Sequence, residues 1–181
     1  MKEEVIYQGM TFVPYITRDE IQNRIQEIGK ELTEKYAGKN PLFICVLNGS
    51  FPFAADLFRQ IDTDAEITFI RLKSYEGTES TGKIKEIIGL QESIEGRPVI
   101  VVEDIVDTGN TIAKLIKDLE TRKPSDIKVA SLLFKPESLQ QGKAPDYIGF
   151  SIPSKFIIGF GLDIDGMARN LKDIYVLKEQ R

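Results

Sequence analysis

The segment 99–111 contains two adjacent carboxylates followed by a run of small polar residues. Glu103 and Asp104 come directly after the apolar run 99–102, which is typical of a buried strand. Residues 107–111 read Asp-Thr-Gly-Asn-Thr and precede a helical pattern. The amides of such a loop can converge on an anion, because glycine lets the backbone approach closely and the helix start adds partial positive charge. The segment therefore predicts a phosphate site.

The acidic pair needs a role of its own, because carboxylates beside a bound phosphate would otherwise repel it. Two roles fit: holding sugar hydroxyls, or fixing a divalent cation through coordinated water. The chain has neither a Walker A loop nor a G-x-G-x-x-G fingerprint. It also has no histidine, so acid–base chemistry falls to Asp, Glu, Lys or Tyr side chains.

Alternating strand-like and helix-like patterns must position this segment. Thr17 and Glu20 have the spacing of a capping box and predict a helix that ends before Gly38. A second helix is expected over 53–58, and a third is expected to be capped by Thr111. The sequence predicts strands at 42–46, 65–70, 99–102, 127–134, 148–150, 156–158 and 174–177. This alternation predicts an α/β fold with a mostly parallel twisted sheet flanked by helices.

Composition restricts the class of protein. The 181 residues favour one domain, and the net charge of −4 disfavours a nucleic-acid partner. The single cysteine, Cys45, lies in an apolar run and is expected to be a buried strand residue in a reducing compartment. No signal peptide or long apolar stretch is visible, so we expect a cytoplasmic protein without a membrane span.

A strand, an acidic pair, two apolar residues and Asp-Thr-Gly-x-Thr closely resemble the phosphoribosyl pyrophosphate motif of type I phosphoribosyltransferases. The aspartate at position 107 makes the motif resemble that of the purine branch of the family. Four further segments resemble family motifs in the same order: 46–50 the pyrophosphate loop, 73–82 the mobile lid, and 129–135 with 155–163 the purine site. The resemblance covers most of the chain. It implies one domain over 1–181 with the type I phosphoribosyltransferase fold, including a small hood formed by about 1–15 and 145–181.

The resemblance to the hypoxanthine-guanine type implies a reaction as well as a fold. The chain would join hypoxanthine or guanine to phosphoribosyl pyrophosphate, giving IMP or GMP and releasing pyrophosphate, with Mg²⁺ as the cofactor. Members of this family often form homodimers or homotetramers, so we expect one of these. Neither a nucleic acid nor a membrane is an expected partner.

The resemblance also implies roles for residues around the sugar. Asp107 would be the catalytic acid/base at purine N7, while Glu103 and Asp104 would face the ribose hydroxyls and Mg²⁺. The residues that would hold the 5-phosphate are Asp107, Thr108, Gly109, Asn110 and Thr111. Those that would contact pyrophosphate are Leu47, Asn48, Gly49 and Arg169, with the Leu47–Asn48 bond expected in the cis form.

Roles on the purine side follow from the same resemblance. Lys135 would donate to the exocyclic O6, Phe156 would stack on the ring, and the Ile157 backbone would read the base edge. Asp163 would contribute to the purine site and to a second Mg²⁺ site. Ser74 and Tyr75 would belong to a lid that excludes water.

Three positions depart from common family forms. Asn48 and Asn110 stand where a basic residue is frequent, which removes positive charge from an anion site. Residues 166–168 read Gly-Met-Ala in place of bulkier side chains and make the alignment of Arg169 less secure.

Other interpretations of the same residues remain open at this point. Lys135 could be a surface lysine, Phe156 a core residue, and Asp163 part of a turn. A xanthine-preferring enzyme of the same branch fits equally well, because xanthine also carries O6. An RNA-binding phosphoribosyltransferase homologue is disfavoured by Asp107 and by the acidic composition. A signalling receiver domain would carry its acidic pair near its start, not at Glu103.

Overall fold

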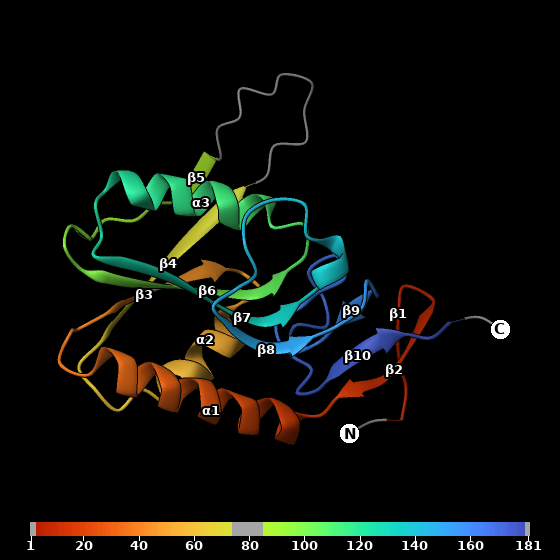
Figure 1. The fold of residues 1–181 in the computed structure, drawn as a ribbon. Helices are drawn as coiled ribbons and strands as arrows, with labels where there is room; N and C mark the ends of the chain where they lie inside the picture. Colours follow the sequence, from red (N-terminus) through yellow and green to blue (C-terminus); the bar gives the residue numbers. More distant parts are fainter. Residues whose placement is uncertain (1–2, 74–84, 180–181) are drawn as a thin grey trace.

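Five parallel strands form the central sheet of the computed structural model, which describes residues 3–73 and 85–179 (Figure 1). In sheet order they are β4 (Glu66–Lys73), β3 (Leu42–Leu47), β6 (Pro98–Val106), β7 (Asp126–Phe134) and β8 (Tyr147–Ser151), and β5 (Lys85–Ile88) pairs antiparallel with β4. The predicted mostly parallel sheet is confirmed. The apolar runs 42–46 and 98–102 are buried throughout, as expected of central strands covered on both faces.

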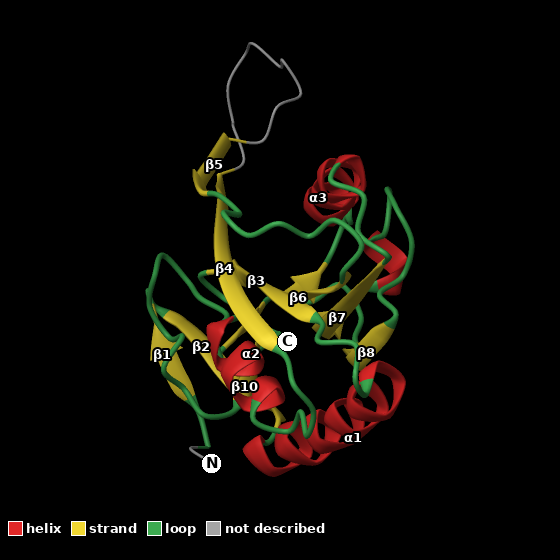
Figure 2. Ribbon diagram, turned by 90° about the vertical axis from the view of Figure 1, so that its left-hand side faces the viewer, coloured by secondary structure: helices red, strands yellow, loops and turns green. Residues whose placement is uncertain are grey.

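Helices cover both faces of this sheet. Figure 2 shows α3 (Asn110–Thr121) on one side and α1 (Arg18–Tyr36) with α2 (Phe51–Phe58) on the other. The capping box at the start of α1 is confirmed, because Thr17 Oγ1 accepts from the Glu20 amide at 3.2 Å and Glu20 Oε2 accepts from the Thr17 amide at 2.8 Å. A cap of this kind stabilises a helix by about 1 kcal/mol.

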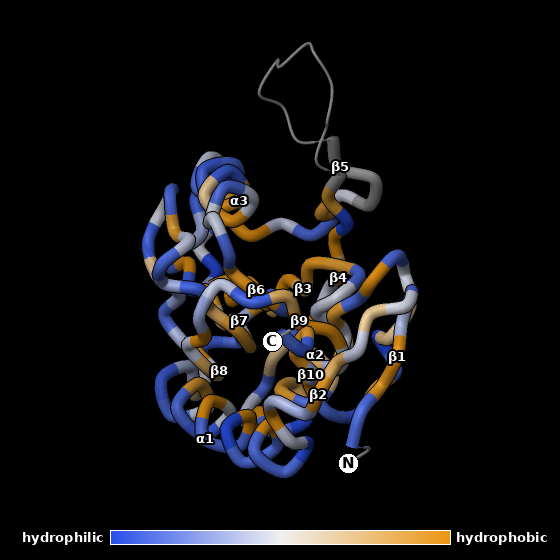
Figure 3. Tube along the Cα trace, turned by 90° about the vertical axis from the view of Figure 1, so that its right-hand side faces the viewer, coloured by the Kyte–Doolittle hydropathy of each residue, from blue (hydrophilic) through white to orange (hydrophobic). Residues whose placement is uncertain are grey.

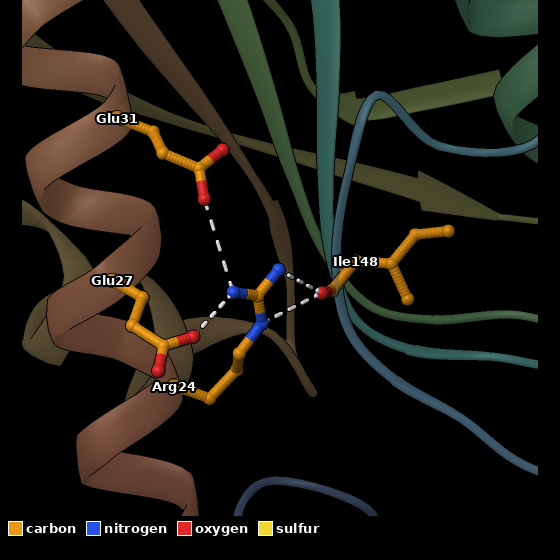
Figure 4. A network of polar contacts seen from close by, with 4 residues as sticks. All are labelled: Arg24, Glu27, Glu31 and Ile148. Atoms are coloured by element: carbon orange, nitrogen blue, oxygen red, sulfur yellow. Dashed lines mark hydrogen bonds and ion pairs between the residues drawn. The ribbon is translucent and has the colours of Figure 1, made fainter.

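The polar side of α1 is also tied to the sheet. Arg24 Nε and Nη2 donate to the carbonyl oxygen of Ile148 in β8 at 3.1 and 2.9 Å (Figure 4). Glu27 lies 2.6 Å from Arg24 Nη1, and Glu31 lies 3.8 Å from the same nitrogen. Arg24 therefore links α1 to β8, while the buried isoleucines of α1 pack beneath the sheet.

A second, smaller sheet lies beside the carboxyl ends of the central strands (Figure 1). It is antiparallel, with the order β1 (Val5–Tyr7), β2 (Met10–Ile16), β10 (Ile174–Leu177) and β9 (Ile157–Ile158). Figure 3 shows hydrophobic residues gathered on the strands and hydrophilic residues along the outer side of α1. The range 145–181 expected for the hood includes β8, which instead pairs with β7 in the central sheet.

Two local expectations around the acidic pair are wrong. The strand expected to end at residue 102 continues to Val106, because β6 stays paired with β7 as far as Phe134. Glu103 therefore lies within a strand. Thr111 does not cap α3, because Gly109 takes the N-cap position with a left-handed φ of 78° and Thr111 falls in the first turn. Glycine adopts that conformation without the cost that a side chain would add.

The lid residues Ser74 and Tyr75 lie outside the described residues. The structure describes the two strands that flank them, β4 and β5. Within residues 3–73 and 85–179, no helix is long and apolar enough to cross a membrane.

Cys45 is fully buried in β3, as expected, and its Sγ lies 2.9 Å from Ser50 Oγ. Burial raises the pKa of this thiol to about 11. We expect native protein at pH 8 to react with Ellman's reagent about a hundredfold more slowly than unfolded protein, because the thiolate is the reactive form. Cys45 is the only cysteine, so absorbance at 412 nm reports it alone. Equal rates in buffer and in denaturant would contradict this prediction.

Candidate active site

Three loops meet where neighbouring parallel strands end, which is the usual ligand position in an open α/β sheet. Residues 48–50 follow β3, residues 107–109 follow β6, and Lys135 follows β7. The second sheet adds the loop 159–173 between β9 and β10. The sequence-predicted site residues of the described chain come from these four segments, the adjoining strands, the start of α3 and Phe156 just before β9.

The loop after β6 presents unpaired amides. The N–H groups of Thr108 and Gly109 donate no hydrogen bond to any residue within the described ranges. The first intrahelical bond of α3 runs from the Ala113 amide to the Gly109 oxygen at 2.9 Å, so the helix start is open to a ligand. Free amides at a helix N-terminus favour an anion, and this loop has the chemistry of the predicted phosphate site.

The acidic pair is partly buried and has incomplete hydrogen bonding. Glu103 Oε2 is buried and has no hydrogen-bond partner among the described residues. Burial raises the pKa of Glu103 well above its usual value, and the neighbouring Asp104 charge adds to this. Burial also raises the pKa of Asp104, while the Ile105 amide, 2.9 Å from Oδ1, and the Arg169 charge oppose the shift. The pair is therefore suited to a cation or to hydroxyl donors that a ligand supplies.

A hard cation fits this donor set only together with ligand oxygens. No group of three or more ligand-type side chains occurs in the part of the chain that the structure describes. Mg²⁺ usually binds one or two carboxylates together with substrate phosphates and water, so the buried Glu103 oxygen and Asp104 match its preference. Asp163 does not join these two carboxylates in such a group, because it pairs with Arg169 instead.

Gly49 brings the loop after β3 against the acidic pair. A Cβ atom at this position would lie 1.6 Å from Asp104 Oδ2 and 3.3 Å from Arg169 Nη1. On the other side, a Cβ at Gly161 would lie 2.0 Å from the Gly49 oxygen. The Leu47–Asn48 peptide bond is cis, as expected. Only glycine allows these backbone segments to approach so closely.

Arg169 connects the loop 159–173 to the acidic pair. Its Nη2 lies 2.8 Å from Asp163 Oδ1, and its Nη1 donates to the Gly161 oxygen at 2.6 Å. Asp163 Oδ2 also accepts from the Gly166 amide at 2.7 Å. Asp163 thus takes part in a local turn, as one open interpretation held, and it also orients the arginine beside Asp104.

Asp107 and Lys135 meet although they are far apart in the sequence. Lys135 Nζ donates to Asp107 Oδ2 at 2.9 Å, and its backbone amide donates to the Val106 oxygen at 3.0 Å. The Lys135 side chain is 11% exposed and that of Asp107 is 44% exposed. The interpretation of Lys135 as a surface lysine is therefore wrong, and Asp107 remains open to a ligand.

Phe156 and Ile157 behave differently from each other. Phe156 is 45% exposed and its ring centroid lies 5.8 Å from that of Phe12, so it is not a core residue. Together with Met10, Phe156 lines a surface cavity beside the second sheet. Ile157 is buried in β9, so only its backbone is available to a base.

Two contacts that shape the site were not predicted from the sequence. Gly161 packs on Gly49 through a contact between distant loops. Residues 139–141 lie behind Gly109 and bind the Thr108 carbonyl. Gly161 has a left-handed backbone conformation, and the glycine itself, within the purine motif, is the only indication of this in the sequence. The sequence does not indicate that Gly161 packs against Gly49.

Comparison with known proteins shows which family has this arrangement. Residues 17–165 match the family model of the phosphoribosyl transferase domain. The hypoxanthine-guanine phosphoribosyltransferase of Streptococcus thermophilus (strain CNRZ 1066) is 44% identical over 91% of this chain and 92% of its own length. The hypoxanthine-guanine-xanthine phosphoribosyltransferase of Tritrichomonas foetus is 45% identical over 90% of this chain and 89% of its own.

Longer proteins and solved structures match as well. The bifunctional protein TilS/HprT of Listeria innocua is 43% identical over 91% of this chain, which spans only 26% of that protein. The crystal structure of a hypoxanthine phosphoribosyltransferase from Staphylococcus aureus superposes with a TM-score of 0.87 at 38% identity, covering 91% of this chain and 90% of that one. These matches confirm the type I fold and exclude the receiver-domain alternative. The chain belongs to the phosphoribosyltransferase family, among the enzymes of purine salvage.

Proposed function

We propose that this chain transfers the phosphoribosyl group of phosphoribosyl pyrophosphate to hypoxanthine or guanine, giving IMP or GMP and pyrophosphate. The observation that carries the proposal is the Asp107–Lys135 pair, held at 2.9 Å beside the free amides of Thr108 and Gly109. It brings groups suited to a base edge next to a loop suited to a sugar phosphate.

The phosphate end of the substrate is assigned to the loop 107–111. The free amides of Thr108 and Gly109 bind the 5-phosphate, and the hydroxyls of Thr108 and Thr111 add donors. Asn110, exposed at the first position of α3, contributes no charge. Backbone amides at a helix start bind phosphate without a counter-charge, which suits a chain that lacks a basic residue at 110.

The ribose and the pyrophosphate are assigned to the acidic pair and its neighbours. Glu103 and Asp104 accept hydrogen bonds from the ribose hydroxyls, and Arg169 balances the negative charge of the leaving pyrophosphate beside Leu47, Asn48 and Gly49. Glu103 and Asp104 would hold one Mg²⁺ and Asp163 would contribute to a second, and the metal would neutralise charge on the pyrophosphate group. Because Asn48 has an amide side chain, Arg169 is the cation that we assign to this subsite.

The base is assigned to the edge formed by Asp107, Lys135, Phe156 and Ile157. Positive charge builds on the purine and on the sugar as N9 bonds to the anomeric carbon. Asp107 stabilises this charge and accepts or donates a proton at N7, an effect of about 10²–10⁴-fold in comparable systems. Phe156, already exposed, stacks on the ring, and the Ile157 backbone reads the base edge.

Lys135 sets the preference for a 6-oxo base, because its ammonium group donates to O6 and faces a donor in adenine. We expect Lys135→Ala to reduce the ratio of hypoxanthine to adenine kcat/KM about tenfold or more, since a buried donor facing a donor is strongly disfavoured. Steady-state rates with both bases measure the ratio. Lys128→Ala serves as a control, because Lys128 pairs with Asp146 and has no assigned role in the site. An unchanged ratio in Lys135→Ala would assign the selectivity to another residue.

The proposed function is tested with a panel of radiolabelled bases. Hypoxanthine, guanine, xanthine and adenine are incubated with phosphoribosyl pyrophosphate, with and without Mg²⁺, and nucleotide products are separated by chromatography. IMP and GMP formation that needs Mg²⁺ supports the proposal, and the absence of any nucleotide contradicts it. XMP as the main product would favour the xanthine-preferring alternative. Xanthine is included because the name of the Tritrichomonas foetus relative includes xanthine.

A homodimer or homotetramer remains a proposal from the family, as does a location in the cytoplasm. Sedimentation equilibrium across a range of protein concentrations measures the assembly state. Magnesium dependence of the panel reaction tests the cofactor independently of assembly.

A further inference from the structure

Residues 139–141, which we name the strap, lie directly behind the loop 107–111. The amides of Gln140 and Gln141 both donate to the Thr108 carbonyl oxygen, at 3.0 and 3.1 Å. The strap follows the short 3-10 helix η1 (Pro136–Ser138), which itself begins after Lys135. The backbone that carries the base-side lysine therefore continues into direct contact with the phosphate loop.

The strap also fills the space behind Gly109. A Cβ at Gly109 would lie 2.2 Å from the Gln141 oxygen and 2.7 Å from Leu139 Cδ1. The Leu139 side chain packs against the apolar cluster on the α3 side of the sheet. The next residue, Gly142, approaches the first turn of α3, where a Cβ would lie 3.3 Å from Ala113 Cβ. The strap is thus anchored in the core and pressed against the loop.

These contacts fix the direction of one amide. The carbonyl of Thr108 and the N–H of Gly109 belong to the same peptide unit, which is planar and trans, so the two groups point in opposite directions. Two hydrogen bonds hold the carbonyl toward the strap. The Gly109 N–H must therefore point away from the strap, and it has no partner in the described parts of the chain.

We propose that the strap positions the loop 107–111 for the sugar phosphate, with Leu139 as the positioning residue that keeps the Gly109 N–H aimed at the ligand. This proposal rests on the proposed function and adds to it a residue outside all five sequence motifs. The strap and Lys135 belong to the same segment of the chain, with η1 between them.

The test compares Leu139→Ala with wild-type protein in the hypoxanthine reaction. We expect KM for phosphoribosyl pyrophosphate to rise about tenfold while kcat and KM for hypoxanthine change less than about threefold, because ground-state positioning of the phosphate is lost. Leu139→Met, which conserves volume, restores a KM close to that of wild type. Leu90→Ala is the matched control, because Leu90 packs in the same apolar cluster but outside the strap and the loop.

Each outcome distinguishes this proposal from the proposed function. A wild-type protein that makes no IMP defeats the proposed function, whereas active wild-type protein with an unchanged KM in Leu139→Ala overturns the strap. Equal rises in KM for Leu139→Ala and Leu90→Ala also overturn it, since they indicate general loss of stability. Leu139→Val removes one methylene group and is measured in parallel. It must raise the same KM about threefold, and a wild-type value in Leu139→Val counts against the proposal even where Leu139→Ala does not fold.

Discussion

Asp107→Asn lowers turnover by a factor of ten or more while leaving binding of phosphoribosyl pyrophosphate largely unchanged. The amide has nearly the same shape as the carboxylate, but it carries no negative charge and accepts no proton at neutral pH. It therefore fails to stabilise the charge that develops on the purine and the sugar, and a tenfold loss corresponds to about 1.4 kcal/mol of transition-state stabilisation. The chain has no histidine that could take over the proton transfer.

This prediction separates catalysis from binding in one variant. Stopped assays give kcat for IMP formation, and titration calorimetry gives the affinity for phosphoribosyl pyrophosphate with Mg²⁺. Asp118→Asn is a suitable control, because Asp118 is an exposed carboxylate in α3 that pairs with Arg122 and has no assigned role in the site. Turnover near that of wild type in Asp107→Asn would remove Asp107 from the mechanism.

Gly109→Ala raises KM for phosphoribosyl pyrophosphate about a hundredfold. Its Cβ would lie 2.2 Å from the Gln141 oxygen, so either the loop or the strap must move, and misplacement of about 1 Å in a site costs about that factor. Gly109 also has a φ of 78°, which disfavours alanine by itself.

A matched substitution isolates the contact from the backbone strain. Gly96 has a similar φ of 70°, but a Cβ there meets no atom within 4 Å. Gly96→Ala therefore carries the conformational cost without the collision, and its KM should equal that of wild type. Comparable KM values for the two alanine variants would show that the space behind Gly109 is unimportant for substrate binding. Thermal melting of both proteins measures their shared loss of stability.

Patterns within a single segment predicted most of the fold. The capping box at Thr17 marked the start of α1, and the strand over 174–177 was placed to the residue. Ends of elements were predicted less well where pairing between strands extends them. β6 continues to Val106 because β7 provides partners as far as Phe134, and no property of residues 103–106 alone indicates this.

The site followed a similar division. The motif residues were predicted from the sequence, but most of the contacts between them arise from packing between loops that are distant in the sequence. The Lys135–Asp107 ion pair and the contact of Gly49 with Asp104 depend on the order of strands in the sheet, whereas the Arg169–Asp163 ion pair forms within the loop 159–173. The strap had no sequence signal, because its hydrogen bonds use backbone amides that every non-proline residue carries.

The meeting of Gly49 with Gly161 constrains how this enzyme can be rebuilt. Each glycine leaves the room that the other backbone occupies, and a Cβ at Gly161 would also approach Pro52 Cδ to 3.0 Å. A chimera that takes only one of the two loops from a relative with a side chain at either position will lose the close contact between the loop after β3 and the loop 159–173. Engineers who wish to exchange these loops should therefore transplant them as a pair.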